Sequence, residues 1–148
     1  MDLTLNGERR SAEVDPRMLL VEALRDAFGA RGPKIGCLTG DCGACTVRVD
    51  GAIVKSCLRL AVSADGADVQ TLEGLAGEDG LSELQQAFWD AHAFQCGYCL
   101  SGMLFAAGDL LEREASPTDE EIREAISGNL CRCTGYDPIV AAIRAVAG

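Results

Sequence analysis

The sequence has few basic residues, a single His and no long apolar run. Its 148 residues contain 13 Lys and Arg but 23 Asp and Glu, which gives a net charge of −10 at pH 7. This balance excludes nucleic acid and an anionic membrane surface as expected partners, because both are bound through basic faces. Apolar runs of only a few residues predict no membrane insertion. The start MDLTLNGERR has no apolar stretch after basic residues, so we expect no export signal and a cytoplasmic protein.

Cysteine, in contrast, is abundant, with eight residues in the chain. A disulfide framework is disfavoured, because it is typical of small, loop-rich chains that carry an export signal. In a reducing compartment this many thiols favours metal binding, in which thiolate is the ligand. The cysteines form two groups, Cys37, Cys42, Cys45 and Cys57 with the spacing C-x4-C-x2-C-x11-C, and Cys96, Cys99, Cys131 and Cys133 with the spacing C-x2-C-x31-C-x-C.

The first half of the chain has the pattern of strands packed on one helix, an α+β unit. Alternating apolar residues around Asn-Gly and Asp-Gly dipeptides predict tight hairpins, and an Asp-Pro pair before a helical apolar pattern predicts a helix start. The predicted elements are a hairpin in residues 1–14, a helix with Asp15 as N-cap that stops at Gly29, a hairpin of strands 46–49 and 52–55, and a strand over 68–72.

The second half of the chain is predicted to be helical. The segment EGLAGEDG is rich in Gly and acids and is the best linker candidate, so we expect domains over 1–74 and 81–148, joined by 75–80. Four short helices predict a small bundle. The first two helices are expected over 81–94 and 101–113. The third begins at the capping-box pattern of Thr118 to Glu121, and the fourth begins at Asp137-Pro138.

The first cysteine group has the spacing of a plant-type [2Fe–2S] site. Gly36, Gly40 and Gly43 separate its first three cysteines, and glycine allows the backbone to approach an inorganic cluster closely. Cys57, on the far strand of the following hairpin, is expected to close the site. Structural zinc is the alternative, although three ligands in one loop suit it poorly. A Rieske centre is excluded, since it needs two His ligands.

The second cysteine group is less diagnostic. Its two pairs lie at two predicted helix–helix junctions, which one end of a bundle brings together. The spacing alone leaves three alternatives open: a [2Fe–2S] cluster, a zinc site, and a redox-active dithiol formed by the C-x-x-C pair.

Three motifs together carry a resemblance to a known family. GCLTGDCGACTV with Cys57, then QCGYC, then NLCRCTGY closely resemble the iron–sulfur (small) subunit of the xanthine dehydrogenase/aldehyde oxidase family of molybdenum hydroxylases. The resemblance covers nearly the whole chain. It implies a β-grasp, plant-type ferredoxin-like domain followed by a four-helix bundle, and a [2Fe–2S] cluster in each.

The resemblance also implies the protein's role and partners. Such a subunit carries no catalytic residues for substrate chemistry and relays electrons outward from molybdopterin, usually the cytosine dinucleotide form, on a large subunit. FAD on a medium subunit or an external acceptor would receive them. The bundle cluster would lie next to the pterin, and the ferredoxin-like cluster nearer the flavin or solvent. The rival interpretations are a free-standing two-cluster ferredoxin and a structural zinc module.

The resemblance also implies that two residues contact the pterin. Gln95 matches a family glutamine whose side chain hydrogen-bonds the pterin, and Cys133 matches the cysteine whose main chain approaches the pterin amino group. One departure occurs after Cys99, where the family commonly reads C-T-P-G and this chain has Leu100 and Ser101. We expect Ser101 to cap the following helix in place of the proline.

Overall fold

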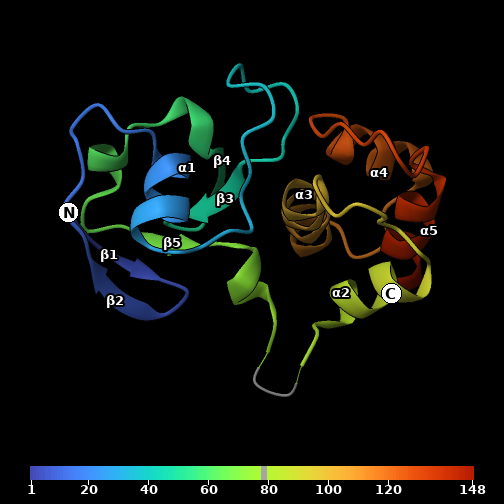
Figure 1. Cartoon of the computed structure of the whole chain (residues 1–148). Coiled ribbons are helices and arrows are strands. Elements are labelled where there is room, and N and C mark those ends of the chain that lie inside the picture. Colours follow the sequence, from blue (N-terminus) through green and yellow to red (C-terminus); the bar gives the residue numbers. More distant parts are fainter. Residues whose placement is uncertain (78–79) are drawn as a thin grey trace.

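The computed structural model describes residues 1–77 and 80–148, which form a mixed sheet with short helices and a separate helical part. The two parts lie side by side in Figure 1, the sheet in blue and green and the helical part in yellow to red. The five strands have the order β2-β1-β5-β3-β4, in which β1 and β5 are parallel and the other neighbours antiparallel. They are β1 (Asp2–Leu5), β2 (Glu8–Ser11), β3 (Thr46–Val49), β4 (Ala52–Lys55) and β5 (Asp68–Gln70).

Both predicted hairpins are present. Asn6 and Gly7 have φ values of 51° and 85°, and Asp50 and Gly51 have 49° and 83°. Two consecutive positive φ values are what the tight turn between twisted antiparallel strands requires, and Asn-Gly and Asp-Gly reach them at low cost. The turn dipeptides therefore set the register of β1 on β2 and of β3 on β4.

The predicted start of the first helix was wrong. Asp15 forms a turn instead, in which its carboxylate accepts the backbone N–H of Arg17 at 2.8 Å. The next residues pair with a distant segment, because Leu19 bridges Leu60 and the N–H of Leu20 donates to the carbonyl of Arg59 at 2.7 Å. Helix α1 (Leu20–Glu22) begins only after this pairing and continues as a π-helix over Ala23–Ala27.

Two other predictions in this part were too long or slightly displaced. The last strand ends at Gln70, and a 3₁₀-helix over Leu72–Leu75 follows it. Cys57 lies in a 3₁₀-helix, Ser56–Leu58, directly after β4 and not on the strand. The predicted linker, 75–80, contains residues 78 and 79, which lie outside the described residues.

The helical part consists of α2 (Glu83–Asp90), α3 (Leu100–Arg113), α4 (Asp119–Ile126) and α5 (Asp137–Val146). Thr118 and Glu121 form the predicted capping box at α4. Helix α2 ends four residues earlier than expected. Its C-terminus is closed by a residue of positive φ, His92 at 51°, and by the N–H of Ala93, which donates to the carbonyl of Phe88 at 2.9 Å.

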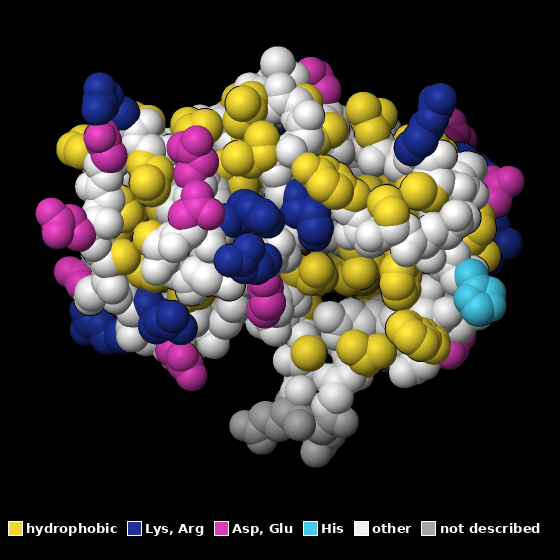
Figure 2. Space-filling view, viewed as in Figure 1, with side chains coloured by type: hydrophobic (Ala, Val, Ile, Leu, Met, Phe, Trp, Pro, Cys, Tyr) yellow, Lys and Arg dark blue, Asp and Glu magenta, His cyan; other side chains and the backbone are white. Residues whose placement is uncertain are grey.

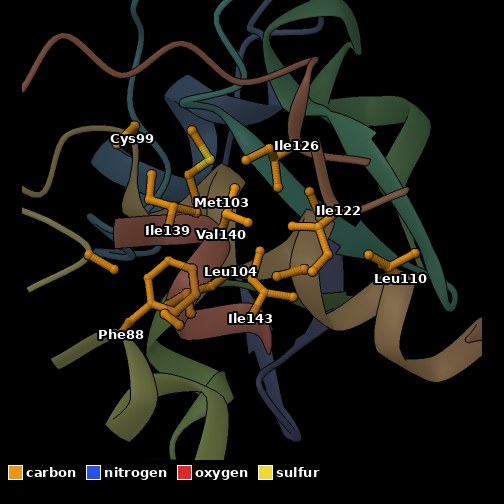
Figure 3. Close-up of a cluster of buried hydrophobic side chains, with 14 residues drawn as sticks. Phe88, Cys99, Met103, Leu104, Leu110, Ile122, Ile126, Ile139, Val140 and Ile143 are labelled. Carbon is orange, nitrogen blue, oxygen red and sulfur yellow. The ribbon is translucent and has the colours of Figure 1, made fainter. Parts of the chain in front are cut away.

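The core of the helical part draws on all four helices. Figure 3 shows the buried side chains of Phe88, Met103, Ile122, Ile139 and Ile143 converging between the helices. Each is at most 1% exposed, so the packing of these helices on one another buries a continuous apolar interior. No helix among residues 1–77 and 80–148 is long and apolar enough to cross a membrane.

Helix α3 joins the two parts. It packs against β3, and we call this boundary the seam. Ser101 does not cap α3, as expected from the sequence, because Cys99 occupies the N-cap position. The Ser101 side chain is fully buried, and its hydroxyl donates across the seam to the carbonyl of Thr46 at 3.0 Å. At the outer edge of the seam, Arg48 and Glu112 form an ion pair at 2.8 Å.

Candidate metal centres

The first cysteine group lies in the irregular loop before β3 and in the 3₁₀-helix after β4. The thiol of Cys37 accepts the backbone N–H groups of Thr39 and Cys42, each at 3.4 Å. Hydrogen bonds from the side chain of Thr39 and from these N–H groups lower the pKa of Cys37 to about 6. A thiol with this pKa is mostly thiolate at neutral pH, the form that binds iron.

The other thiols of this group lie deeper. Cys45 and Cys57 are buried together beside Val21. Burial, with the neighbouring Cys45, raises the pKa of Cys57 to about 11. Burial also raises the pKa of Cys42, to which Cys37 and Cys45 contribute. Cys37 and Cys45 thus lie close enough to Cys42 and Cys57 to affect their pKa values.

Glycine makes this close approach possible. A Cβ atom on Gly36 would lie 2.7 Å from the sulfur of Cys42, and a Cβ on Gly40 would lie 2.7 Å from Leu58 Cδ1. Gly40 also has a φ of 87°, which disfavours any side chain. The loop therefore forms a cradle that side chains would fill, as expected for a backbone wrapped around an inorganic cluster.

The second cysteine group combines two loops of the helical part. Cys96 and Cys99 precede α3, and Cys131 and Cys133 lie between α4 and α5. The sulfur atoms of Cys96 and Cys133 are 3.6 Å apart. Thiols from the two junctions thus lie next to one another.

The pKa values of this group also differ with depth. Burial, with the neighbouring Cys131, raises the pKa of Cys99 to about 12. The backbone N–H of Tyr98 lowers the pKa of Cys96, and the nearby Cys133 does so too. Burial opposes ionisation of Cys131, but hydrogen bonds from Thr134 lower its pKa overall. Each group therefore contains a readily ionised thiol beside a deeply buried one.

The donor set of each group fits a two-iron cluster. All eight cysteines are free thiols. A [2Fe–2S] cluster binds through four cysteine thiolates, the number that each group offers.

Gln95 and Cys133 are also brought together. Gln95 follows α2 in the loop before Cys96, and its side-chain amide donates to the backbone carbonyl of Cys133 at 3.1 Å. Both residues are exposed. The two residues singled out for a pterin contact therefore occupy one surface, next to the second cysteine group.

The two cysteine groups are connected across the seam. The N–H of Leu130, which precedes Cys131, donates to the carbonyl of Cys42 at 2.9 Å. The hydroxyl of Tyr98, between Cys96 and Cys99, donates to the carbonyl of Ile35 at 2.6 Å. One loop of each group thus contacts a loop of the other directly. Figure 2 shows apolar side chains gathered along the middle of the face that it draws.

The residues that make these connections have no strong signal in the sequence. Tyr98 and Leu130 lie inside the quoted cysteine motifs but ligate nothing, and Lys34 lies 5.9 Å from the centre of the Tyr98 ring. Their position within a motif was the available signal. Their partners lie far away in the sequence, so only the folded chain identifies the contacts.

Two family models match the chain and together cover most of it. Residues 3–76 match a family described as 2Fe-2S iron-sulfur cluster binding domain, and residues 71–144 match one described as [2Fe-2S] binding domain. The matches support two [2Fe–2S] clusters, as the sequence predicts.

Similar proteins match over almost the full length. The nicotine 6-hydroxylase small subunit of Paenarthrobacter nicotinovorans is 51% identical over 97% of this chain and 86% of the relative. The nicotinate dehydrogenase small FeS subunit of Eubacterium barkeri is 51% identical over 97% of this chain and 92% of the relative. The crystal structure of quinoline 2-oxidoreductase from Pseudomonas putida 86 contains a chain of 48% identity with a TM-score of 0.95, which covers 99% of this chain and 91% of that one.

Proposed function

Because this chain belongs to the iron–sulfur small subunits of the xanthine dehydrogenase/aldehyde oxidase family of molybdenum hydroxylases, we propose that it conducts electrons between the partner subunits of one oxidoreductase. The family assignment confirms the resemblance drawn from the cysteine motifs. When bound, [2Fe–2S] clusters supply one-electron transfer at potentials set by hydrogen bonds and exposure. Substrate chemistry belongs to the large subunit, and this chain holds, spaces and shields the clusters.

In this proposal each cysteine group holds one cluster. The pKa values of Cys37 and of the exposed Cys96 are both lowered, and N–H groups already point at their sulfurs. The same N–H groups then stabilise negative charge on the ligands. The buried Cys57 and Cys99 shield the inner side of each site from water. The ligands are Cys37, Cys42, Cys45 and Cys57 in the first site and Cys96, Cys99, Cys131 and Cys133 in the second.

We assign the two sites to two domains, 1–74 and 81–148, joined by 75–80. We assign the first domain to the β-grasp fold, in which the mixed sheet packs on α1. We assign the second to a four-helix bundle of α2 to α5. Two separate hydrophobic cores support this division, one around Leu20 and Val47 and one around Phe88 and Met103. Each domain has its own core and its own ligand set.

The observation that carries the relay is the hydrogen bond from Leu130 N–H to the carbonyl of Cys42. Cys42 is a ligand of the first site, and Leu130 adjoins Cys131 of the second. Only backbone atoms and one 2.9 Å hydrogen bond separate the two ligands. Such a direct link suits two centres that work in series, since neither has to diffuse to the other.

The second site is the entry point for electrons in this proposal. Cys96 and Cys133 are exposed, and Gln95 lies beside them on the same surface. A glutamine amide has both donor and acceptor atoms, which matches the edge of a pterin. Gln95 and the main chain of Cys133 would therefore orient a pterin presented by the large subunit. The first site, across the seam, would pass electrons to the flavin or to solvent.

The assembly follows from the family. We propose a large subunit that binds molybdopterin as the cytosine dinucleotide, and a medium subunit that binds FAD. A cytoplasmic location fits eight free thiols, because a reducing compartment keeps them available as ligands.

Co-purification tests this function against a free-standing ferredoxin. A tagged chain, expressed together with its partner subunits, should retain a molybdenum-containing large subunit in equal amount through gel filtration. A chain that elutes alone with both clusters intact would contradict the subunit assignment and favour the free ferredoxin.

A further inference from the structure

Three segments of the chain meet at the side chain of Asn129. One is the first cysteine loop at Gly43, next to Cys42, and another is the start of α3 at Gly102. The third is the segment after α4 that contains Asn129 itself, two residues before Cys131. The meeting point therefore lies within three residues of ligands from both cysteine groups.

The two glycines leave no room for a side chain of their own at this point. A Cβ atom on Gly43 would lie 2.1 Å from Asn129 Oδ1, and a Cβ on Gly102 would lie 2.2 Å from the same atom. Any side chain at either glycine would overlap the amide. Glycine at both positions thus admits the Asn129 oxygen between two backbones, one from each side of the seam.

The Asn129 amide is held but incompletely paired. The residue is 3% exposed, and its Nδ2 donates only a long bond, 3.4 Å, to the carbonyl of Ile126. Among the described residues, no N–H or O–H group donates to its Oδ1. A buried oxygen without such a donor costs folding free energy, so this residue is a poor choice for stability alone. Its neighbours are the Cα–H groups of the two glycines, which offer only weak donors.

Hydrogen bonds on both sides of the Asn129 side chain hold the neighbouring segments in place. Thr46 Oγ1 donates to the carbonyl of Gly43 at 2.7 Å. Lys55 Nζ donates to the carbonyl of Gly128 at 3.1 Å. Directly beyond Asn129, the N–H of Leu130 donates to the carbonyl of Cys42. Asn129 is thus adjacent in sequence to the residue that bonds one cysteine group to the other.

We propose that Asn129 is a positioning residue, which spaces the two cluster-binding loops and aligns the hydrogen bond between Leu130 and Cys42. This inference rests on the proposed function, because it assumes that both cysteine groups hold clusters. Asn129 ligates no iron, and its effect reaches the clusters through the backbone of the loops. The shape of the amide, which lies between Gly43 and Gly102, sets the spacing of the two loops in this proposal.

The test is the magnetic interaction between the two reduced clusters, measured by EPR as the splitting and relaxation of each signal. Asn129→Ala should keep the iron and sulfide content of the unmodified protein but weaken this interaction, because the loops are no longer held in register. In hydrogen-exchange mass spectrometry, peptides that contain Leu130 should lose protection.

Asn6→Ala is the matched control. The Asn6 amide also lies against a glycine, Gly74, and accepts the N–H of Thr71 at 2.8 Å, but neither neighbour adjoins a cysteine in the sequence. Asn6→Ala should lower the melting temperature and leave the magnetic interaction unchanged. This separates a general loss of stability from a loss of spacing between the clusters.

Identical EPR spectra for Asn129→Ala and the unmodified protein would overturn the inference. If Asn129→Ala loses iron, Asn129→Ser, which keeps an oxygen on Cβ, should restore the iron content and still weaken the interaction. Loss of iron in both variants would also overturn it, because Asn129 would then be needed to build a site and not to space two. An unmodified chain without iron would instead refute the proposed function.

Discussion

The side-chain amide of Gln95 donates to the backbone carbonyl of Cys133 at 3.1 Å, although 37 residues of sequence lie between them. This bond fixes an exposed amide beside two exposed thiols of the second cysteine group. The surface on which these groups lie is the one that we assign to the pterin of the large subunit.

Gln95→Ala should therefore affect the assembled enzyme and not the isolated chain. All eight thiols remain, so both cluster signals should persist and chemical reduction of the small subunit should be unchanged. Pterin atoms left without a partner at the interface would cost about 1–3 kcal/mol. Stopped-flow measurements should show slower reduction of the second-site cluster by substrate, or gel filtration should show weaker retention of the large subunit.

Gln86→Ala is a suitable control, because Gln86 is an exposed residue of α2 whose side-chain amide donates to the carboxylate of Asp90 on the same helix. It should behave as the unmodified protein does. Unchanged substrate-driven reduction and retention in Gln95→Ala would count against the pterin contact.

Cys42→Ser should remove the first cluster and leave the second. The two ligand sets share no residue, and the helical part has its own core. Limited proteolysis should therefore detect loosening over residues 30–60, while the EPR signal of the second cluster remains. Loss of both signals would show that the two domains do not form their sites independently.

Ser101→Ala tests the bond that crosses the seam. Its hydroxyl is buried and donates to the carbonyl of Thr46, so removal leaves a buried acceptor unpaired and should destabilise the protein by about 1–3 kcal/mol. Chemical denaturation measures this loss. Ser127→Ala, which removes an exposed hydroxyl bonded to the carbonyl of Glu124, should have little effect. Equal stability of the two variants would mean that this bond does not hold α3 to the sheet.

Glu73 links the end of the sheet domain to the loop before the first site. Its carboxylate accepts the N–H of Gly32 and the hydroxyl of Thr71, each at 2.6 Å. Partial burial opposes ionisation, but the hydrogen bonds from Thr71 and Gly32 lower the pKa of Glu73 overall. A lowered pKa in the folded state stabilises the protein fully above the ordinary pKa of Glu, about 4.3. This contribution is lost as the pH falls through the lower, folded-state value.

Glu73→Gln should accordingly lower the melting temperature at pH 7 and have a smaller effect near pH 3. The control is Glu13→Gln, at an exposed carboxylate, which should change the melting temperature little at either pH. A melting-temperature difference for Glu73→Gln that did not shrink on acidification would contradict the role of the ionised form.

Local signals in the sequence predicted the features that depend on adjacent residues. The turns at Asn6-Gly7 and Asp50-Gly51 and the capping box of Thr118 follow from the residues themselves. The first helix start could not be predicted in this way. Leu19 pairs with Leu60, a tertiary contact that outweighs the local preference for Asp15 as an N-cap.

Features of the candidate sites also differ in whether the sequence predicts them. Cysteine spacing and motifs predicted both thiol groups, because ligands of one cluster recur in short, characteristic runs. The seam was not predictable from the sequence. Ser101 was predicted to cap a helix but binds Thr46. Asn129 is the first residue of a cysteine motif, but its side chain lies against two glycines of other segments. Such roles depend on residues that meet only after folding.

Metal analysis of freshly isolated protein, with EPR after reduction, tests the central claim most directly. Two [2Fe–2S] clusters require about four iron and about four acid-labile sulfide per chain. Because the two ligand sets differ in backbone, burial and hydrogen bonding, reduction should give two distinguishable EPR signals. Stoichiometric zinc without iron, or a single cluster signal with half the iron, would contradict the account.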